Sequence, residues 1–291
     1  MINTFFLIVS CFWALGRAAD WSYPSFPKWG GLCDEGKQQS PIDLNDQESK
    51  KVNLDRLILH NYEKTQENLT MVNNGHTIQV SGFKSNLTLS GGILKNEYVL
   101  EQIHMHWESE HTINGIRYPL EMHFVHRNPI YPNIKTATMF EDGVAVIGVL
   151  FHESHVENEL LGAVTRILKA VKGYDMIDQP VKMEEPLVLD YLVPSLKSYY
   201  SYAGSLTTPG CSEAVTWIVL TETLPVSLQQ LTKFKEIEYR PGMQLRSNYR
   251  ELQTKGDRKV FLVSEAPELA RLSVPLSLIL TFTIANQKFF L

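Results

Sequence analysis

Most of the chain consists of short apolar or alternating stretches separated by turn residues, a pattern that predicts strands. Residues 77–80 and 87–89 are short examples. Residues 144–151 are apolar almost without interruption, as in a central strand buried on both faces. Residues 215–220 are rich in β-branched and aromatic side chains, which also favours a strand.

Two helices stand out from this pattern. In residues 158–172 six apolar positions fall on one helical face, and Gly173 ends the helix. These positions are Leu160, Leu161, Val164, Ile167, Leu168 and Val171. Ser227 and Gln230 form a capping box that starts a short helix toward Phe234. Because strands dominate and do not alternate with helices, we expect a mainly β (α+β) single domain with a large, mostly antiparallel sheet and few peripheral helices.

Three histidines flank a predicted hairpin. His104 and His106 are two residues apart, so in a strand they point to the same face. Asn114-Gly115 is the strongest short-range hairpin signal, and His123 follows it. If Asn114-Gly115 is a two-residue turn, His106 lies opposite His123 and His104 sits diagonally beside it.

Three imidazoles on one face are a ligand set for Zn²⁺ with the fourth position left for water, the arrangement of a catalytic zinc site. The alternative is that they are ordinary polar strand residues. Five of the nine histidines fall between residues 104 and 126, which weakens that alternative. Three unpaired imidazoles would also be costly to bury without a metal or other partners.

Length and charge narrow the class of protein. A chain of 291 residues can bury a sizeable core as one domain. Its net charge of -5 gives no footprint for nucleic acid.

Both ends of the chain are unusually apolar. Residues 1–18 have the apolar stretch and small residues of a signal peptide, although no Lys or Arg stands before the apolar stretch. Residues 264–291 are too short for a comfortable transmembrane helix but suit a removable GPI-attachment signal. Ser264 and Ala266 could provide its small-residue site, whereas Glu265 fits poorly. The alternatives are a buried segment or membrane anchor at the N-terminus and a packed strand or helix at the C-terminus.

Secretion would explain the cysteines. Cys11 leaves with the signal peptide, and Cys33 and Cys211 then form one disulfide in an oxidising compartment. Asn68 and Asn86 begin glycosylation sequons, consistent with surface loops of a protein that is secreted or held at the extracellular face of the plasma membrane.

The chain resembles the α-class carbonic anhydrases of extracellular or membrane-associated type over about residues 21–262. The matching runs are residues 39–43, 73–76, 102–107, 109–112, 121–126 and 204–209. This resemblance implies a roughly ten-stranded twisted sheet with zinc at the bottom of a conical cleft. It also implies reversible hydration of CO2 to bicarbonate and a proton by zinc-bound hydroxide.

In the family the three histidines hold Zn²⁺ through neutral nitrogens, and the metal lowers the pKa of its water from 15.7 to about 7. The partners implied for the imidazoles are Gln102 for His104, the backbone carbonyl of Asn248 for His106, and Glu121 for His123. Such partners fix the tautomer and orientation of each ring, and losing one typically costs about 10–100-fold in metal affinity or activity.

The resemblance also implies roles around the metal. Thr207 would accept the hydroxide's proton and donate its own hydroxyl hydrogen to Glu110, and Thr208 would assist in binding bicarbonate. The positions implied for the CO2 pocket are Val125, Val146, Leu206, Val215 and Trp217, all of which could equally be core residues. His76 matches the histidine that carries protons to solvent. The positions lining its water chain are Tyr23, Asn74 and Gln79, the last replacing a common asparagine. Cys33 and Cys211 match the disulfide of extracellular members.

Some positions depart from the family pattern. Glu101 stands where an apolar cleft residue is frequent, Tyr200 and Tyr249 replace frequent tryptophans, and the stretch between Trp107 and Glu110 is short. None of these removes an implied ligand. The alternative to an enzyme is a non-catalytic carbonic-anhydrase-like binding or adhesion module at the cell surface. A zinc peptidase does not fit, because the sequence has no H-E-x-x-H run.

Overall fold

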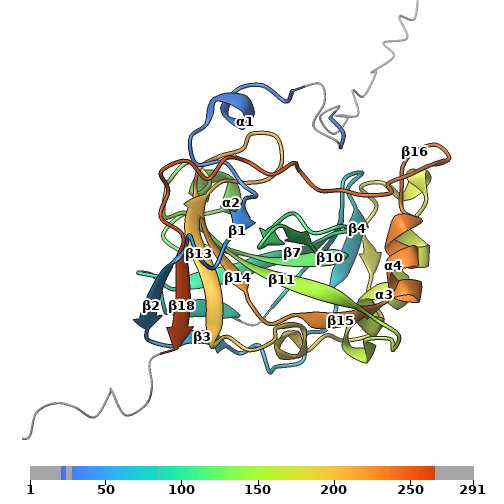
Figure 1. Cartoon of the computed structure of the whole chain (residues 1–291). Helices are drawn as coiled ribbons and strands as arrows, with labels where there is room; N and C mark the ends of the chain where they lie inside the picture. The colour runs from blue at the N-terminus through green and yellow to red at the C-terminus, as the bar shows by residue number, and fades with distance from the viewer. Residues whose placement is uncertain (1–20, 24–27, 85, 266–291) are drawn as a thin grey trace, which may run out of the picture.

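One large twisted sheet forms the centre of the molecule (Figure 1). The computed structural model describes residues 21–23, 28–84 and 86–265. Within them, a continuous path of ten strands runs through the sheet in the order β12 (Val181–Lys182), β4 (Thr70–Asn73), β5 (Ile78–Ser81), β7 (Tyr98–His106), β10 (Leu120–Arg127), β11 (Val144–Ser154), β14 (Val215–Leu220), β13 (Ser198–Gly204), β18 (Phe261–Glu265) and β2 (Lys50–Leu54). Three further strands join this sheet: β15 (Leu224–Ser227) beside β11, and β6 (Thr88–Gly91) beside β7, with β3 (Leu57–His60) beside β6.

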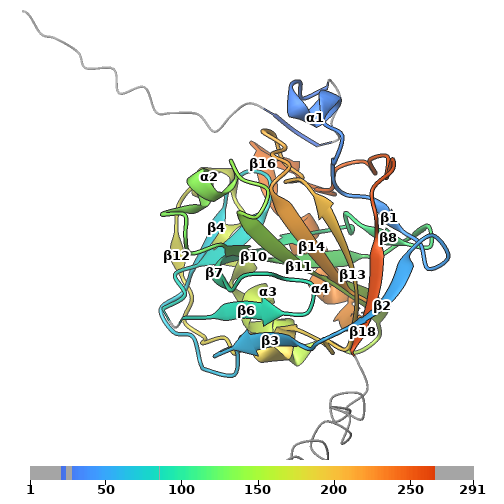
Figure 2. The same ribbon diagram turned by 90° about the vertical axis from the view of Figure 1, so that its left-hand side faces the viewer.

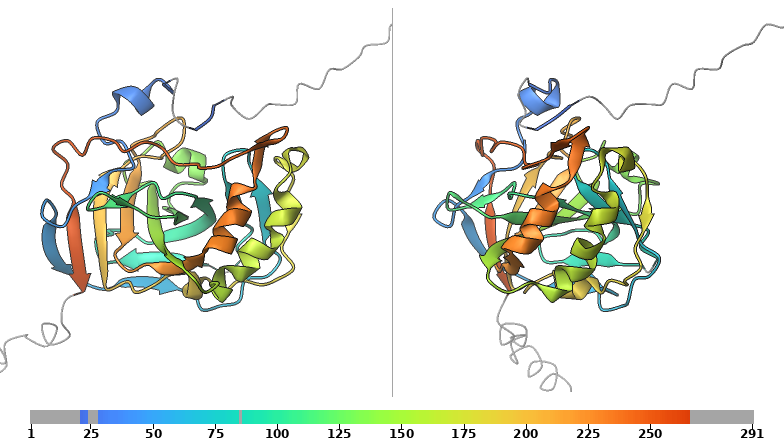
Figure 3. Two further views of the ribbon diagram at one scale, coloured as in Figure 1. Left: turned by 45° about the vertical axis from the view of Figure 1, so that its right-hand side comes forward. Right: turned by 90° about the vertical axis from the view of Figure 1, so that its right-hand side faces the viewer.

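The remaining elements are short and peripheral. Two smaller sheets consist of β1 (Asp43–Leu44), β8 (Thr112–Ile113) and β9 (Ile116–Arg117), and of β16 (Glu238–Arg240) and β17 (Met243–Gln244). The helices are α1 (Leu32–Glu35), α2 (Ile134–Ala137), α3 (Glu159–Val171) and α4 (Leu228–Lys235), with 3₁₀ turns at Tyr174–Met176 and Leu189–Leu192. Helices α3 and α4 lie side by side at one flank of the sheet (Figure 3).

The predicted fold class is confirmed. Most neighbouring strands are antiparallel, while β11 runs parallel to β14 and β15, and β18 runs parallel to β2. The first eight residues of β11 are all buried, as their continuous apolar sequence predicts. The sheet is therefore mixed locally but mainly antiparallel.

Both predicted helices form, and the apolar face of one differs from the prediction. The Asn158 side chain caps α3 by accepting from the backbone N–H groups of Leu160 and Leu161. Leu160 is 46% exposed, so it does not belong to the buried face that begins with Leu161. At about 100° per residue position 160 lies at the edge of this buried face, and it stands in the first turn of the helix. The capping box of Ser227 and Gln230 is present at the start of α4.

The Asn114-Gly115 hairpin is present as predicted, but it joins the two-residue strands β8 and β9 and not the two histidine strands. Asn114 and Gly115 both have positive φ and join β8 to β9, where Ile113 pairs with Ile116. Strand β8 does not stay in the main sheet; it pairs in parallel with β1 instead. The hairpin register therefore ends at β8 and β9.

The predicted pairing between the histidine strands is wrong by two residues. His123 lies opposite His104, and Glu121 lies opposite His106. The cause is that five residues, 107–111, lie between the paired positions His106 and Thr112, whereas three residues, 118–120, lie between their partners Arg117 and Glu121. Because the displacement is an even number, the three histidines still share one face.

The pleat of β7 and β10 separates two environments. Ile103 and Met105 on β7 and Phe124 on β10 belong to the larger apolar cluster on one side of the sheet (Figure 2 gives a second view of the strands). Alternate residues, including the three histidines, face the other side. A second buried cluster that includes Val146 lies there.

The predicted signal peptide and most of the predicted GPI-attachment signal lie outside the described residues, within 1–20 and 266–291. Ser264 is described and lies in β18, opposite Ser198. No helix among the described residues is long and apolar enough to cross a membrane. Asn68 and Asn86 are both exposed.

Candidate active site and metal centre

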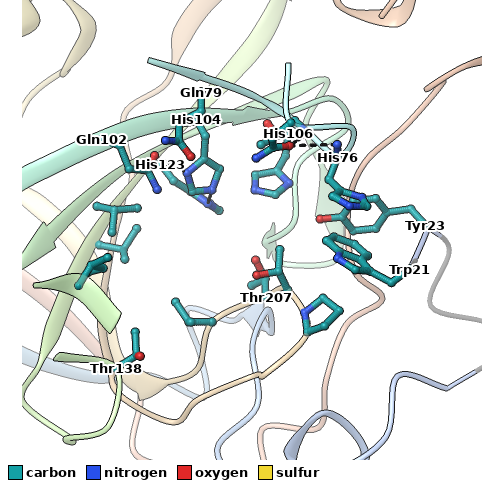
Figure 4. A pocket seen from close by; sticks show the side chains of 18 of the residues that line it. Trp21, Tyr23, His76, Gln79, Gln102, His104, His106, His123, Thr138 and Thr207 are labelled. Atoms are coloured by element: carbon teal, nitrogen blue, oxygen red, sulfur yellow. Dashed lines mark hydrogen bonds between the residues drawn. The ribbon is translucent and has the colours of Figure 1, made fainter. Parts of the chain in front are cut away.

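A cleft of about 360 Å³ opens on the histidine face of the sheet (Figure 4). The predicted residues that line it are Tyr23, Asn74, His76, Gln79, Gln102, His104, His106, His123, Val125, Val146, Leu206, Thr207, Thr208 and Trp217. Four other predicted residues are buried and do not line it: Glu110, Glu121, Val215 and Asn248. Most of the residues singled out from the sequence therefore meet at this one cleft.

The three histidines converge at the base of the cleft. One ring nitrogen from each of His104, His106 and His123 lies within 4.8 Å of those of the other two. His104 Nε2 is 3.2 Å from His123 Nδ1. His106 Nε2 is buried and has no hydrogen-bond partner among the described residues. A buried, unpartnered imidazole nitrogen facing two others is the arrangement expected of a metal site, so these residues fit Zn²⁺.

The other nitrogen of each ring meets an acceptor. His104 Nδ1 is 2.9 Å from Gln102 Oε1, and His106 Nδ1 is 2.6 Å from the backbone oxygen of Asn248. His123 Nε2 is 2.7 Å from Glu121 Oε1. An N–H donated to each acceptor leaves the inward nitrogen of each neutral ring with its lone pair free for a metal.

Burial keeps these rings neutral. It lowers the pKa of His106 to about 4 and holds the pKa of His104 well below its usual range, with the charges of its two histidine neighbours acting in the same direction. Burial also lowers the pKa of His123, although Glu121 opposes the shift. A neutral imidazole is the form that binds a metal.

Glu121 connects His123 to the loop that contains Glu110 and His111. Its Oε1 accepts from His123 and from His111 Nδ1, each at 2.7 Å. Its Oε2 accepts from the backbone N–H groups of Glu110 and His111, each at 2.8 Å. Burial alone would raise the pKa of Glu121, but His111 and His123 hold it well below the usual range.

The role of His111 was not predicted from the sequence. Its Nε2 is 2.7 Å from the Tyr202 hydroxyl, so the ring bridges Glu121 and β13. The sequence signals for it were the excess of histidines between residues 104 and 126 and its place in the matching run 109–112. His111, Glu121 and His123 also cluster closely enough for a metal, but their facing atoms are hydrogen-bonded to one another.

Glu110 lies behind Thr207 and is fully buried. Its Oε1 accepts from the backbone N–H of Arg250 at 3.0 Å, and its Oε2 is 3.5 Å from His106 Nε2. Burial raises the pKa of Glu110 to about 7, although His123 and the Thr207 side chain act in the opposite direction. Thr207 itself is 6% exposed and faces the cleft.

The loop that carries Thr207 is braced by a disulfide. The predicted bond between Cys33 and Cys211 is confirmed. Cys211 N donates to the Thr208 carbonyl at 3.0 Å, which closes the loop. The Arg250 guanidinium, which the sequence gave no reason to single out, donates to the Cys33 carbonyl at 2.6 Å. The loop, the N-terminal segment and the Glu110 region are thereby connected.

The wall beside the histidines is apolar. Val125, Val146 and Leu206 line it together with Trp217, whose indole N–H donates to the Ser205 carbonyl at 3.1 Å. Val215 belongs to the same buried cluster without reaching the cleft. This wall offers a non-polar molecule packing contacts close to the three histidines.

His76 sits higher in the cleft. Its ring stacks on Trp21, with ring centroids 3.7 Å apart and planes 8° from parallel (Figure 4). The Asn74 side chain holds the turn by accepting from the backbone N–H groups of His76 and Thr77. Burial lowers the pKa of His76 to about 4, partly opposed by Asp178. Trp21 had not been singled out from the sequence.

The departures from the family pattern are accommodated locally. Glu101 does not line the cleft but forms an ion pair with Arg127, with Arg127 Nε 2.5 Å from Glu101 Oε1. Tyr200 is buried and its hydroxyl donates to Asp46. The Arg117 guanidinium lies 4.1 Å above the Tyr249 ring.

Comparison with known proteins agrees with this site. The family described as eukaryotic-type carbonic anhydrase matches residues 20–264. The chain is 33% identical to carbonic anhydrase 6 of Bos taurus, over 89% of this chain and 84% of that protein. It is 33% identical to carbonic anhydrase 3 of Homo sapiens, over 84% of this chain and 98% of that protein. It is 36% identical to alpha carbonic anhydrase 5 of Arabidopsis thaliana, over 81% and 78%. The chain therefore belongs to the eukaryotic-type carbonic anhydrase family, enzymes whose substrates are CO2 and bicarbonate.

Proposed function

We propose that this chain catalyses the reversible hydration of CO2 at a zinc centre held by His104, His106 and His123. The observation that carries this proposal is the buried His106 Nε2, which has no hydrogen-bond partner among the described residues and lies close to one ring nitrogen of each of two other imidazoles. When bound, the ion would supply Lewis acidity, making hydroxide available from water at neutral pH. Gln102, Glu121 and the Asn248 carbonyl would keep the three rings oriented.

The chain's own groups would position the reactants. CO2 is apolar, and the wall formed by Val125, Val146, Leu206 and Trp217 offers it packing contacts beside the metal ligands. We propose that the Thr207 hydroxyl accepts a hydrogen bond from the nucleophile and donates its own hydrogen to Glu110. That pairing would aim an oxygen lone pair at the carbon of CO2.

His76 would carry the released proton to solvent. Stacked on Trp21, it is neutral at pH 7, because burial lowers its pKa to about 4. A neutral imidazole can accept a proton, and exposing the ring to water would bring its pKa back toward 6.5. The proposed transfer thus requires the ring to leave the stack, with Tyr23, Asn74 and Gln79 lining the route.

The decisive experiment measures zinc content and CO2 hydration on the same preparation. Protein with about one zinc per chain should hydrate CO2 far above the buffer rate, and chelation should remove both zinc and activity. Zinc-loaded protein with no turnover would reject the enzymatic proposal and favour a non-catalytic binding or adhesion module.

We also propose that the protein is secreted and reaches the outer face of the plasma membrane through a GPI anchor. The disulfide supports folding in an oxidising compartment. The exposed positions of Asn68 and Asn86 suit glycosylation. Phosphatidylinositol-specific phospholipase should release the protein from intact cells, and retention on treated cells would count against the anchor.

A further inference from the structure

The short helix α2 forms one wall of the cleft mouth. Ile134, Lys135 and Thr138 from this segment line the cleft, and Figure 4 shows Thr138 on a different side of the pocket from Trp21. The Asn133 side chain caps the helix by accepting from Thr136 N at 2.9 Å. The Thr138 hydroxyl donates to the Lys135 carbonyl at 2.9 Å. The backbone of Lys135 is thus held at the rim from both sides.

Lys135 is the one lysine or arginine among the described residues that line this cleft. Within the described chain no hydrogen bond or ion pair engages the Lys135 ammonium group, which is exposed. The cleft therefore presents a single unneutralised cation at its mouth.

The ion pair that contacts the segment leading into α2 does not compete with this cation. Arg127 and Glu101 neutralise each other beside the same wall. Arg127 also donates from Nη1 to the Tyr131 carbonyl, which ties the segment leading into α2 to strand β10. The ion pair thus steadies the wall while leaving the charge of Lys135 unopposed. The chain as a whole carries a net charge of -5, which opposes the approach of anions.

We propose that Lys135 is a binding residue for small monovalent anions, bicarbonate among them, as they enter and leave the cleft. This inference rests on the proposed function, because bicarbonate is the anionic partner of that reaction. An ammonium group at the rim lowers the electrostatic energy of an anion in the cleft, whereas neutral CO2 gains almost nothing from it. Lys135 would then set how strongly anions occupy the cleft and how steeply their binding depends on salt.

The test uses thiocyanate as the probe anion on zinc-loaded full-length mature protein. Its dissociation constant is measured by calorimetry, and its inhibition constant is measured against CO2 hydration. Lys135→Gln should weaken thiocyanate binding about threefold, the effect of one exposed charge. Lys135→Glu should weaken it about tenfold, because the charge change is doubled. Lys135→Arg should bind as tightly as the wild type.

Lys169→Gln is the matched control. It removes one positive charge from α3, and Lys169 does not line the cleft, so thiocyanate binding and turnover should both stay at the wild-type level. The difference between Lys135→Gln and Lys169→Gln should shrink as ionic strength rises.

Equal thiocyanate constants for Lys135→Glu and wild type at low salt would overturn the proposal, as would equal weakening by Lys169→Gln. Absence of CO2 hydration in the wild type would instead reject the proposed function. Calorimetry would still report whether Lys135 binds the anion, so the two failures are distinguishable.

Discussion

The two sides of the cleft are built differently. The strand side consists of His104, His106 and His123 on β7 and β10. The loop side consists of Thr207 and Thr208, together with the buried Glu110, all of which lie outside the strands. Ladder hydrogen bonds and the pleat place the strand-side rings on one face with little further help. The loop side has no ladder of its own and depends on contacts from distant segments.

Those contacts are specific and few. The disulfide joins residues 178 apart, and Arg250 bonds both the Cys33 carbonyl and, through its backbone N–H, Glu110. Glu121 belongs to both sides, because one of its oxygens faces His123 and the other accepts from the Glu110 loop. The strand side should therefore control metal binding, and the loop side should control what the bound metal can do.

The largest expected effect is on the strand side. His106→Ala removes one proposed ligand, and zinc affinity should fall about a thousandfold or more, since structural zinc sites draw several kcal/mol from each ligand. Metal analysis after dialysis and circular dichroism of the same sample would check this. A variant that keeps both zinc and CO2 hydration would contradict the assignment of the site.

Removing the disulfide should affect the loop side more than the strand side. The double variant Cys33→Ser/Cys211→Ser should lose about 3–5 kcal/mol of unfolding free energy, as expected when so long a loop is opened. Below its Tm it should keep most of its zinc while its turnover falls. Parallel loss of zinc and turnover would show that the disulfide supports the whole molecule and not the loop side in particular.

Glu121 and Gln102 offer a matched pair of contacts to two different histidines. Glu121→Gln and Gln102→Leu should each lower zinc affinity about 10–100-fold. Only Glu121→Gln should also lower the turnover of fully zinc-loaded protein, because it weakens the bonds to the Glu110 loop. Equal turnover of the two loaded variants would mean that Glu121 acts on the strand side alone.

The pH dependence of the metal-free protein should differ in sign between the two sides. The folded pKa of His106 is about 4, below its ordinary 6.5, so its contribution to stability is lost as pH falls from about 6.5 to 4. The folded pKa of Glu110 is about 7, above its ordinary 4.5, so its contribution is lost as pH rises from about 4.5 to 7.

Glu110→Gln should therefore stabilise the metal-free protein by about 2 kcal/mol at pH 7.5 and change little at pH 4.5. Denaturant titrations of the wild type and variant at both pH values would measure this. A stabilisation that is the same at both pH values would show that it does not arise from the ionisation of Glu110.

The smallest expected effect lies outside both sides, at the cleft mouth. His76→Ala should slow CO2 hydration about tenfold in weak buffer, and added imidazole should restore it. His152→Ala, which removes an exposed histidine bonded to Thr223, should change nothing. Failure of imidazole to rescue His76→Ala would reject the proton-transfer role.

Many features of the fold and the site could be predicted from the sequence, because they depend on residues close together in the chain. Continuous apolar runs gave the central strands, the capping box gave α4, and the i, i+2 spacing gave two histidines on one face. The pairing of His123 was wrong by two residues, because register depends on how many residues loop out between strands. The prediction that the histidines share one face was still correct, because side chains alternate with a period of two and the register error was two residues.

The sequence alone determined the fold class, the gathering of three histidines on one face and the two cysteines available for a disulfide, because each follows from composition, periodicity or residue count. Only the tertiary structure decided the partners of residues far apart in the chain. Three examples are the contact of His111 with Tyr202, the stacking of Trp21 on His76, and the position of Lys135 at the cleft mouth. Each depends on segments that come together only in the folded protein. Such long-range contacts depend on how the whole chain folds, and the spacing of neighbouring residues does not encode them.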